Sequence, residues 1–178
     1  MLRTVLTYGI VAGLIVGIPS FAITVLFADR PPLPYGMALG YLIMLIALST
    51  VFVAVKRRRD DQLGGVIRFW PGFGLGLAIS LVASLFYIAA WELALSITGT
   101  GFLANYTEAM VADAAKRGAG AAELAGIRAE MDAFWVSYRN PLVRIPYSFI
   151  EIFPVGLLVS LVSAGLLRNP RFLPARTG

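Results

Sequence analysis

The sequence predicts an all-α membrane protein with four transmembrane helices and an extracytoplasmic helical hairpin between the third and the fourth. Of its 178 residues, 58% are hydrophobic and 14% are charged, and the mean hydropathy is +0.79. This apolar content exceeds that of soluble domains. Four apolar stretches can cross a hydrocarbon core of about 30 Å, which takes about 20 helical residues. We expect a single integral membrane domain over residues 1–178.

The first transmembrane span is predicted for residues 4–28. An alternative interpretation is a cleaved signal peptide, because residues 19–22 resemble a cleavage site with small residues. However, the apolar run continues unbroken through residues 23–27, which favours a retained helix.

A row of glycines with a spacing of four lies in this span: Gly9, Gly13 and Gly17. Such a row is typical of a contact face between membrane helices. It indicates either packing within the chain or dimerisation, and we favour packing within the chain because the second span follows directly. An antiparallel second span would bring three of its residues level with the row: Ala47, Thr50 and Ala54.

The second span is predicted for residues 35–55, after a proline-rich turn at residues 29–34. The four basic residues at 56–59 that follow it mark the cytoplasmic side of the membrane. They are weaker evidence for a lipid-binding patch, because Asp60 and Asp61 follow at once.

Counting basic residues orients the whole chain with both termini in the cytoplasm. Nine then lie on the cytoplasmic side: Arg3, Lys56, Arg57, Arg58, Arg59, Arg68, Arg168, Arg171 and Arg176. Six lie outside: Arg30, Lys116, Arg117, Arg128, Arg139 and Arg144. The excess on one side follows the positive-inside rule, and it accounts for the net charge of +5 without a nucleic-acid partner.

Small residues at four-residue spacing also occur in the third span, predicted for residues 72–98, and in the fourth, predicted for residues 147–167. They are Gly72, Gly76, Ser80 and Ser84 in the third span, and Gly156, Ser160 and Ala164 in the fourth. They let two helix backbones approach closely. An antiparallel pair would place Gly76 opposite Ala164, Ser80 opposite Ser160, and Ser84 opposite Gly156.

The segment at residues 99–145 is too long for a structureless loop and has helical periodicity. Its apolar positions recur at intervals of three and four: Leu103, Tyr106, Met110, Leu124, Ile127, Met131, Phe134 and Tyr138. Glycines at residues 118 and 120 interrupt the pattern, and Asn140 with Pro141 ends it. We predict a hairpin of two amphipathic helices that lies on the bilayer or caps the bundle, with the apolar stripe serving packing rather than substrate binding.

Two candidate functional carboxylates, Glu92 and Glu151, lie in the third and fourth spans toward the hairpin. A charge at this depth is costly, so such a side chain usually faces the bundle interior and has a partner. The interpretation that we favour is structural, with both carboxylates reaching water, Arg139 or Arg144.

The alternative interpretation is a small proton- or cation-coupled transporter that uses both carboxylates. Pro154 lacks an N–H and predicts a kink or local widening of the fourth span, which would free backbone carbonyls for a cation. Tyr87 and Ser148 would complete such a site, with the hairpin as its lid.

The chain contains no Cys and no His. Thiolate chemistry is therefore excluded, and the commonest general base and metal ligand is missing. With no catalytic motif either, we expect no enzymatic activity, no cofactor and no metal site. We interpret the chain as a structural or accessory membrane protein that acts through helix or lipid contacts. Its expected partners are the bilayer and either a second copy or another membrane protein.

The order and spacing of several motifs resemble a bacterial family of four-pass membrane proteins, the domain of unknown function number forty-one ninety-nine. The matching text comprises residues 58–65, residues 76–84 with Tyr87 and Trp91, residues 131–134 and 138–141, Glu151, and residues 153–157 and 160–164. The resemblance covers essentially the whole chain and is clearest from Arg58 onward. It implies a location in the bacterial inner membrane and carries no established activity.

Overall fold

The computed structural model describes residues 1–28, 30, 33, 35–99 and 101–175, and this part of the chain contains helices and no strand. The helices are α1 (Leu2–Leu26), α2 (Gly36–Arg57), α3 (Phe69–Thr98), α4 (Phe102–Lys116), α5 (Ala121–Tyr138) and α6 (Pro141–Leu167). A π-helical turn, η1 (Arg58–Gln62), continues α2. Four helices, α1, α2 with η1, α3 and α6, are long and apolar enough to cross a membrane. The all-α fold with four apolar spans is therefore as predicted.

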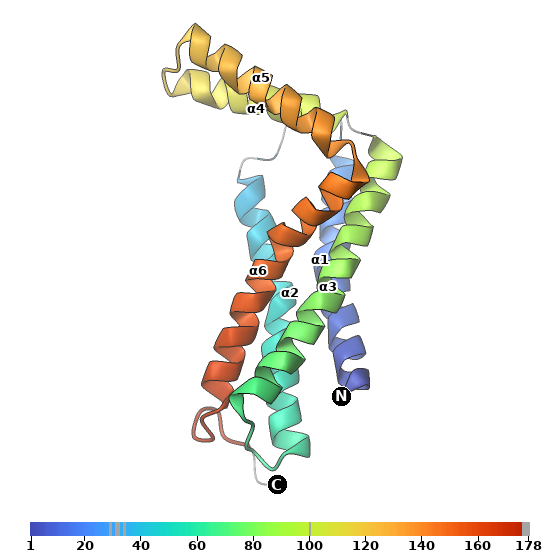
Figure 1. Cartoon of the computed structure of the whole chain (residues 1–178), viewed down its shortest axis with the longest axis vertical. Helices are drawn as coiled ribbons and strands as arrows, with labels where there is room; N and C mark the ends of the chain where they lie inside the picture. Colours follow the sequence, from blue (N-terminus) through green and yellow to red (C-terminus); the bar gives the residue numbers. More distant parts are fainter. Residues whose placement is uncertain (29, 31–32, 34, 100, 176–178) are drawn as a thin grey trace.

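The four long helices run side by side, and α4 and α5 form a hairpin that lies across one end of the bundle (Figure 1). At that end α3 finishes and α6 begins. The start of α1, the end of α6 and the connection from α2 to α3 lie toward the opposite end (Figure 1). The predicted turn between α1 and α2 includes Asp29, Pro31, Pro32 and Pro34, which lie outside the described residues.

The helix α6 begins six residues before its predicted start at residue 147. Asn140 caps it, because its side-chain oxygen accepts a hydrogen bond of 3.0 Å from the N–H of Leu142, and Pro141 occupies the first turn. The charge of Arg144 interrupts the apolar run and conceals this earlier start. The helix also continues through Pro154, which lies inside it.

The glycine row of α1 packs against α3, which corrects the expected contact with Ala47, Thr50 and Ala54 of α2. A Cβ atom built on Gly9 would lie 2.6 Å from the Cβ of Val82, and one on Gly17 would lie 3.2 Å from the Cβ of Ala90. A Cβ on Gly13 would collide with Phe86. The glycines thus form a groove that receives larger side chains, whereas the prediction had matched small residues with small residues.

Small residues do lie between α3 and α6, but their register differs from the predicted one. A Cβ on Gly76 would lie 2.8 Å from the Oγ of Ser160, and one on Gly156 would lie 2.6 Å from the Cβ of Ser80. The prediction placed Ala164 opposite Gly76 and Ser84 opposite Gly156. Each of these two residues lies one helical turn beyond the neighbour that the structure shows. The predicted pair Ser80 and Ser160 is present, with 3.4 Å between the two Oγ atoms. Ser80 and Ser160 thus each lie between two small residues of the facing helix.

Candidate functional site

The carboxylate of Glu92 on α3 is paired with Arg144 on α6. The Nε of Arg144 donates to Oε1 of Glu92 at 2.6 Å, and its Nη2 donates to Oε2. The remaining nitrogen, Nη1, lies 3.5 Å from the carbonyl oxygen of Tyr138 and 3.4 Å from that of Arg139. Arg144 is only 8% exposed. Its guanidinium thus joins α3 and α6 to the end of α5. Of the two arginines expected as partners for Glu92, Arg144 rather than Arg139 forms the ion pair.

The carboxylate of Glu151 has a different partner. The hydroxyl of Tyr87, a buried residue of α3, donates to Oε2 of Glu151 at 2.9 Å. Within the described chain, no Lys or Arg forms an ion pair with Glu151. The hydroxyl of Ser148 donates to the carbonyl of Arg144 in its own helix. The structure therefore joins Glu151 to Tyr87 and places both, with Ser148, on the lining of one cavity, whereas Glu92 is paired with Arg144.

Glu151 lies on the surface of two adjoining cavities at the hairpin end of the bundle. One has a volume of about 350 Å³ and lies among α1, α2 and α3. The other, of about 710 Å³, lies beneath the hairpin. Four residues line both cavities: Tyr87, Trp91, Tyr106 and Glu151. A single carboxylate is thus surrounded by aromatic side chains in a space of small-molecule size.

The apolar stripe of the hairpin forms much of the lining of the larger cavity. Its members there are Leu103, Tyr106 and Met110 from α4, and Met131, Phe134 and Tyr138 from α5. The sequence identifies this stripe, but it predicts packing alone. The stripe borders open volume because the hairpin crosses the end of the bundle at an angle instead of lying flat against it (Figure 1).

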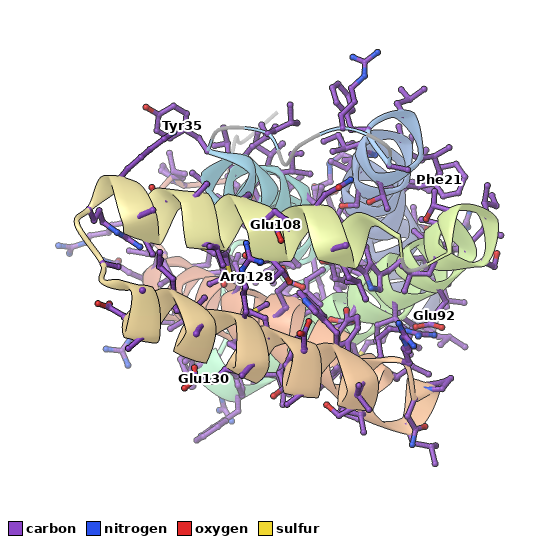
Figure 2. All side chains as sticks on the ribbon, turned by 90° about the horizontal axis from the view of Figure 1, so that it is seen from above. Phe21, Tyr35, Glu92, Glu108, Arg128 and Glu130 are labelled. Atoms are coloured by element: carbon purple, nitrogen blue, oxygen red, sulfur yellow. The ribbon has the colours of Figure 1, made fainter. Side chains whose placement is uncertain are left out.

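Polar contacts fasten the hairpin internally and to α3. The indole N–H of Trp91 donates to the hydroxyl of Tyr138 at 3.0 Å. Burial raises the pKa of the Tyr138 phenol, which keeps this acceptor neutral in ordinary conditions. Between the two hairpin helices, Arg128 forms an ion pair of 2.8 Å with Glu108, and the two side chains face each other in Figure 2. The hairpin is therefore held in a defined position over the cavities.

A buried arginine at the opposite end of the bundle has a role that the sequence reasoning missed. Arg59 is fully buried, and its guanidinium donates to the carbonyl of Phe172 at 2.9 Å and to that of Leu173. Its Nε donates to Asp60 at 2.6 Å. The basic cluster at residues 56–59 indicates membrane orientation, and nothing in its pattern distinguishes the one member that binds the C-terminal segment.

Comparison with curated proteins and with solved structures finds no match to this chain. A family model, in contrast, matches nearly its whole length. The four apolar helices agree with the four-pass architecture implied by the sequence resemblance. The chain belongs to the family described as "Protein of unknown function (DUF4199)", whose model matches residues 7–169.

Proposed function

We propose that the chain is a structural or accessory protein of the bacterial inner membrane, which presents the α4–α5 hairpin for contact with another membrane protein or with a second copy of itself. The observation that carries this proposal is the contact of Arg144 with both the bundle and the hairpin. Its guanidinium pairs with Glu92 on α3 and donates to the carbonyls of Tyr138 and Arg139 at the end of α5. A buried, hydrogen-bonded ion pair fixes orientation well, because either partner alone would be an uncompensated charge. A hairpin with no role in contact would not need such a fixed position. The proposal assigns no catalytic reaction to the chain.

The proposed orientation places both termini in the cytoplasm and the hairpin outside. It is supported by the basic residues that flank the membrane at the end opposite the hairpin, above all residues 56–59. Arg3 at the start of α1, Arg68 just before α3 and Arg168 just after α6 lie at the same end of the bundle (Figure 1), whereas Arg176 falls outside the described residues.

Close helix packing supports a structural role for the bundle itself. The small residues of α1, α3 and α6 face inward, and large apolar side chains such as Leu85, Leu158 and Val162 are more than half exposed on the outside. Lipid would cover these side chains, so the bundle would act as a stable membrane platform for the hairpin.

Site-specific photocrosslinking in intact cells tests the accessory role. A benzoylphenylalanine at Glu130, which lies on the outer side of α5 in Figure 2, would sample contacts of the hairpin. The same group at Leu63, in the connection after η1, is the control at the other end of the bundle. We expect a discrete adduct at Glu130, whose mass identifies a second copy or another protein. Lipid adducts alone, or the same products at both positions, would reject the proposal.

A second candidate function, a small proton- or cation-coupled transporter, is favoured by one observation, the position of Glu151 on the cavity surface. Glu92 contributes less to this candidate because Arg144 already neutralises it. Proton and cation flux into liposomes would be measured for the native chain, for Glu92→Gln and for Glu151→Gln. Flux that depends on Glu151 supports the candidate, and flux no greater than in empty liposomes across a range of pH rejects it.

A further inference from the structure

We propose that the two adjoining cavities form a binding site for an organic ammonium cation, held by the carboxylate of Glu151 and by the aromatic rings around it. This inference goes beyond the accessory role and does not depend on it, because the site lies on the inner side of the hairpin. It rests on three features of the described residues: a carboxylate of Glu151 that has no cationic partner, the character of the lining, and the volume.

Glu151 offers a carboxylate that forms no ion pair with any Lys or Arg of the described residues. Its Oε2 accepts the hydroxyl of Tyr87, and in the described chain its Oε1 accepts no hydrogen bond. Glu92, one turn of α3 beyond Tyr87, has a two-point ion pair with Arg144. The contrast is informative, because a carboxylate in an apolar region usually acquires a cationic partner. For Glu151 that partner would come from outside the chain.

The lining favours an organic cation over a metal ion or an anion. Beyond the rings of Tyr87, Trp91 and Tyr106, the larger cavity is lined by Phe134 and Trp135. The negative faces of such rings attract ammonium groups by cation–π interaction. A hard metal ion needs about six oxygen ligands, which one carboxylate and a few phenols do not supply. Arg30 lines the smaller cavity, whereas no Lys or Arg among the described residues lines the larger one, so the ammonium group is placed in the larger cavity. There, Glu151 would repel an anion.

The volumes are large enough for an ammonium group together with an apolar body. Cavities of about 350 and 710 Å³ fall within the range of small-molecule sites, about 300–1,000 Å³. Apolar side chains such as Ile23 and Met37 line the smaller cavity, and Met110 and Met131 line the larger one. They suit an alkyl or aryl group attached to the nitrogen. The ammonium group has two possible sources, a water-soluble amine or the head group of phosphatidylethanolamine.

Calorimetric titration of the purified full-length chain in a neutral detergent tests the proposal. The probes are 2-phenylethylammonium and its neutral analogue of similar shape, 2-phenylethanol. We expect the cation to bind at least about tenfold more tightly than the alcohol, because only the cation can donate a charge-assisted hydrogen bond to Glu151. Equal affinity for the two probes, or no binding of the cation, would overturn the proposal.

Two variants with matched controls locate the bound cation. Glu151→Gln keeps an acceptor for Tyr87 but removes the charge, and Glu130→Gln removes the same charge from the outer side of the hairpin (Figure 2). Tyr106→Leu removes a ring from the lining, and Tyr35→Leu removes one that is 87% exposed and outside both cavities. We expect about tenfold weaker binding in Glu151→Gln, a smaller loss in Tyr106→Leu, and no change in the controls. Native affinity in both cavity variants would contradict the proposal, even if binding itself were real.

Nanodiscs distinguish the two sources of the ammonium group. The titration with 2-phenylethylammonium would be repeated in phosphatidylglycerol alone and in phosphatidylglycerol mixed with phosphatidylethanolamine. Weaker apparent binding in the mixture assigns the site to the lipid head group, because the lipid competes with the probe. Equal binding in both assigns it to a soluble amine. Loss of binding in both lipids would overturn the proposal.

Discussion

Arg144, one turn into α6, forms a two-point ion pair with Glu92 on α3 while its third nitrogen faces the last carbonyls of α5. One side chain thereby joins two membrane-spanning helices to the hairpin between them. This contact, together with the hydrogen bond from Trp91 to Tyr138, holds the end of α5 against the bundle.

Replacing Arg144 with Met should destabilise the fold. The change leaves Glu92, which is 28% exposed, without its cation and removes a donor to α5, so we expect a loss of about 2–4 kcal/mol. Reversible denaturant unfolding in detergent measures it. The control, Arg139→Met, removes an exposed charge with no ion pair in the described chain and should change stability by less than about 0.5 kcal/mol.

A double variant separates the ion pair from simple packing. Glu92→Leu combined with Arg144→Met removes both charges, so we expect it to be more stable than Arg144→Met alone. Additive losses from the two single changes would show that the pair contributes nothing as a pair.

Alanine at the close contacts of the bundle should also destabilise it. In Gly76→Ala and Gly156→Ala the new methyl groups would approach Ser160 and Ser80 closer than van der Waals contact allows. Overpacking of this kind costs about 1–3 kcal/mol. Gly74→Ala on α3 and Gly165→Ala on α6 are matched controls, because nothing lies within 4 Å of the new atom. Thermal denaturation in detergent should show a lower unfolding midpoint for Gly76→Ala and Gly156→Ala only. Equal midpoints for all four variants would reject the close α3–α6 contact.

Replacing the buried Arg59 with Met should release the C-terminal segment. The carbonyls of Phe172 and Leu173 lose their donors, and hydrogen bonds from a charged group contribute about 1.5–3 kcal/mol each. Hydrogen exchange over residues 168–175 should become faster. The same measurement on Arg57→Met, which removes an exposed charge two residues away, should give native protection. Unchanged exchange in Arg59→Met would show that the segment is held by other contacts, such as that of Phe172 with Phe52.

The sequence predicts the elements of this fold better than their contacts. The four spans and the hairpin follow from hydropathy and periodicity, which are local properties. The helix against which α1 packs cannot be predicted in this way, because the glycine row indicates a groove but not which side chains enter it. Val82 and Phe86 fill the groove, and neither carries a signal that separates it from a lipid-facing residue. The observed α3–α6 register differs from the predicted one for a similar reason, since spacing does not decide whether small residues oppose or interdigitate.

In the candidate site, too, the sequence identifies the residues but not the contacts between them. Glu92 and Glu151 are visible in the sequence as carboxylates in apolar spans, and Arg144 is a nameable partner for one of them. The sequence does not show that Arg144 pairs with Glu92, or that Glu151 lines a cavity. That depends on the angle of the hairpin, which brings Trp91 to Tyr138 across 47 residues of sequence.

Side-specific cysteine labelling tests the central claim. According to this claim, the hairpin lies on the extracytoplasmic side of the membrane and the basic cluster at residues 56–59 lies on the cytoplasmic side. The native chain has no Cys, so Lys116→Cys on the hairpin and Leu63→Cys after η1 each supply one reactive group. With a membrane-impermeant maleimide on intact spheroplasts, we expect Lys116→Cys to be labelled at once and Leu63→Cys only after lysis. Labelling of Leu63→Cys in intact spheroplasts, with Lys116→Cys protected, would contradict the account.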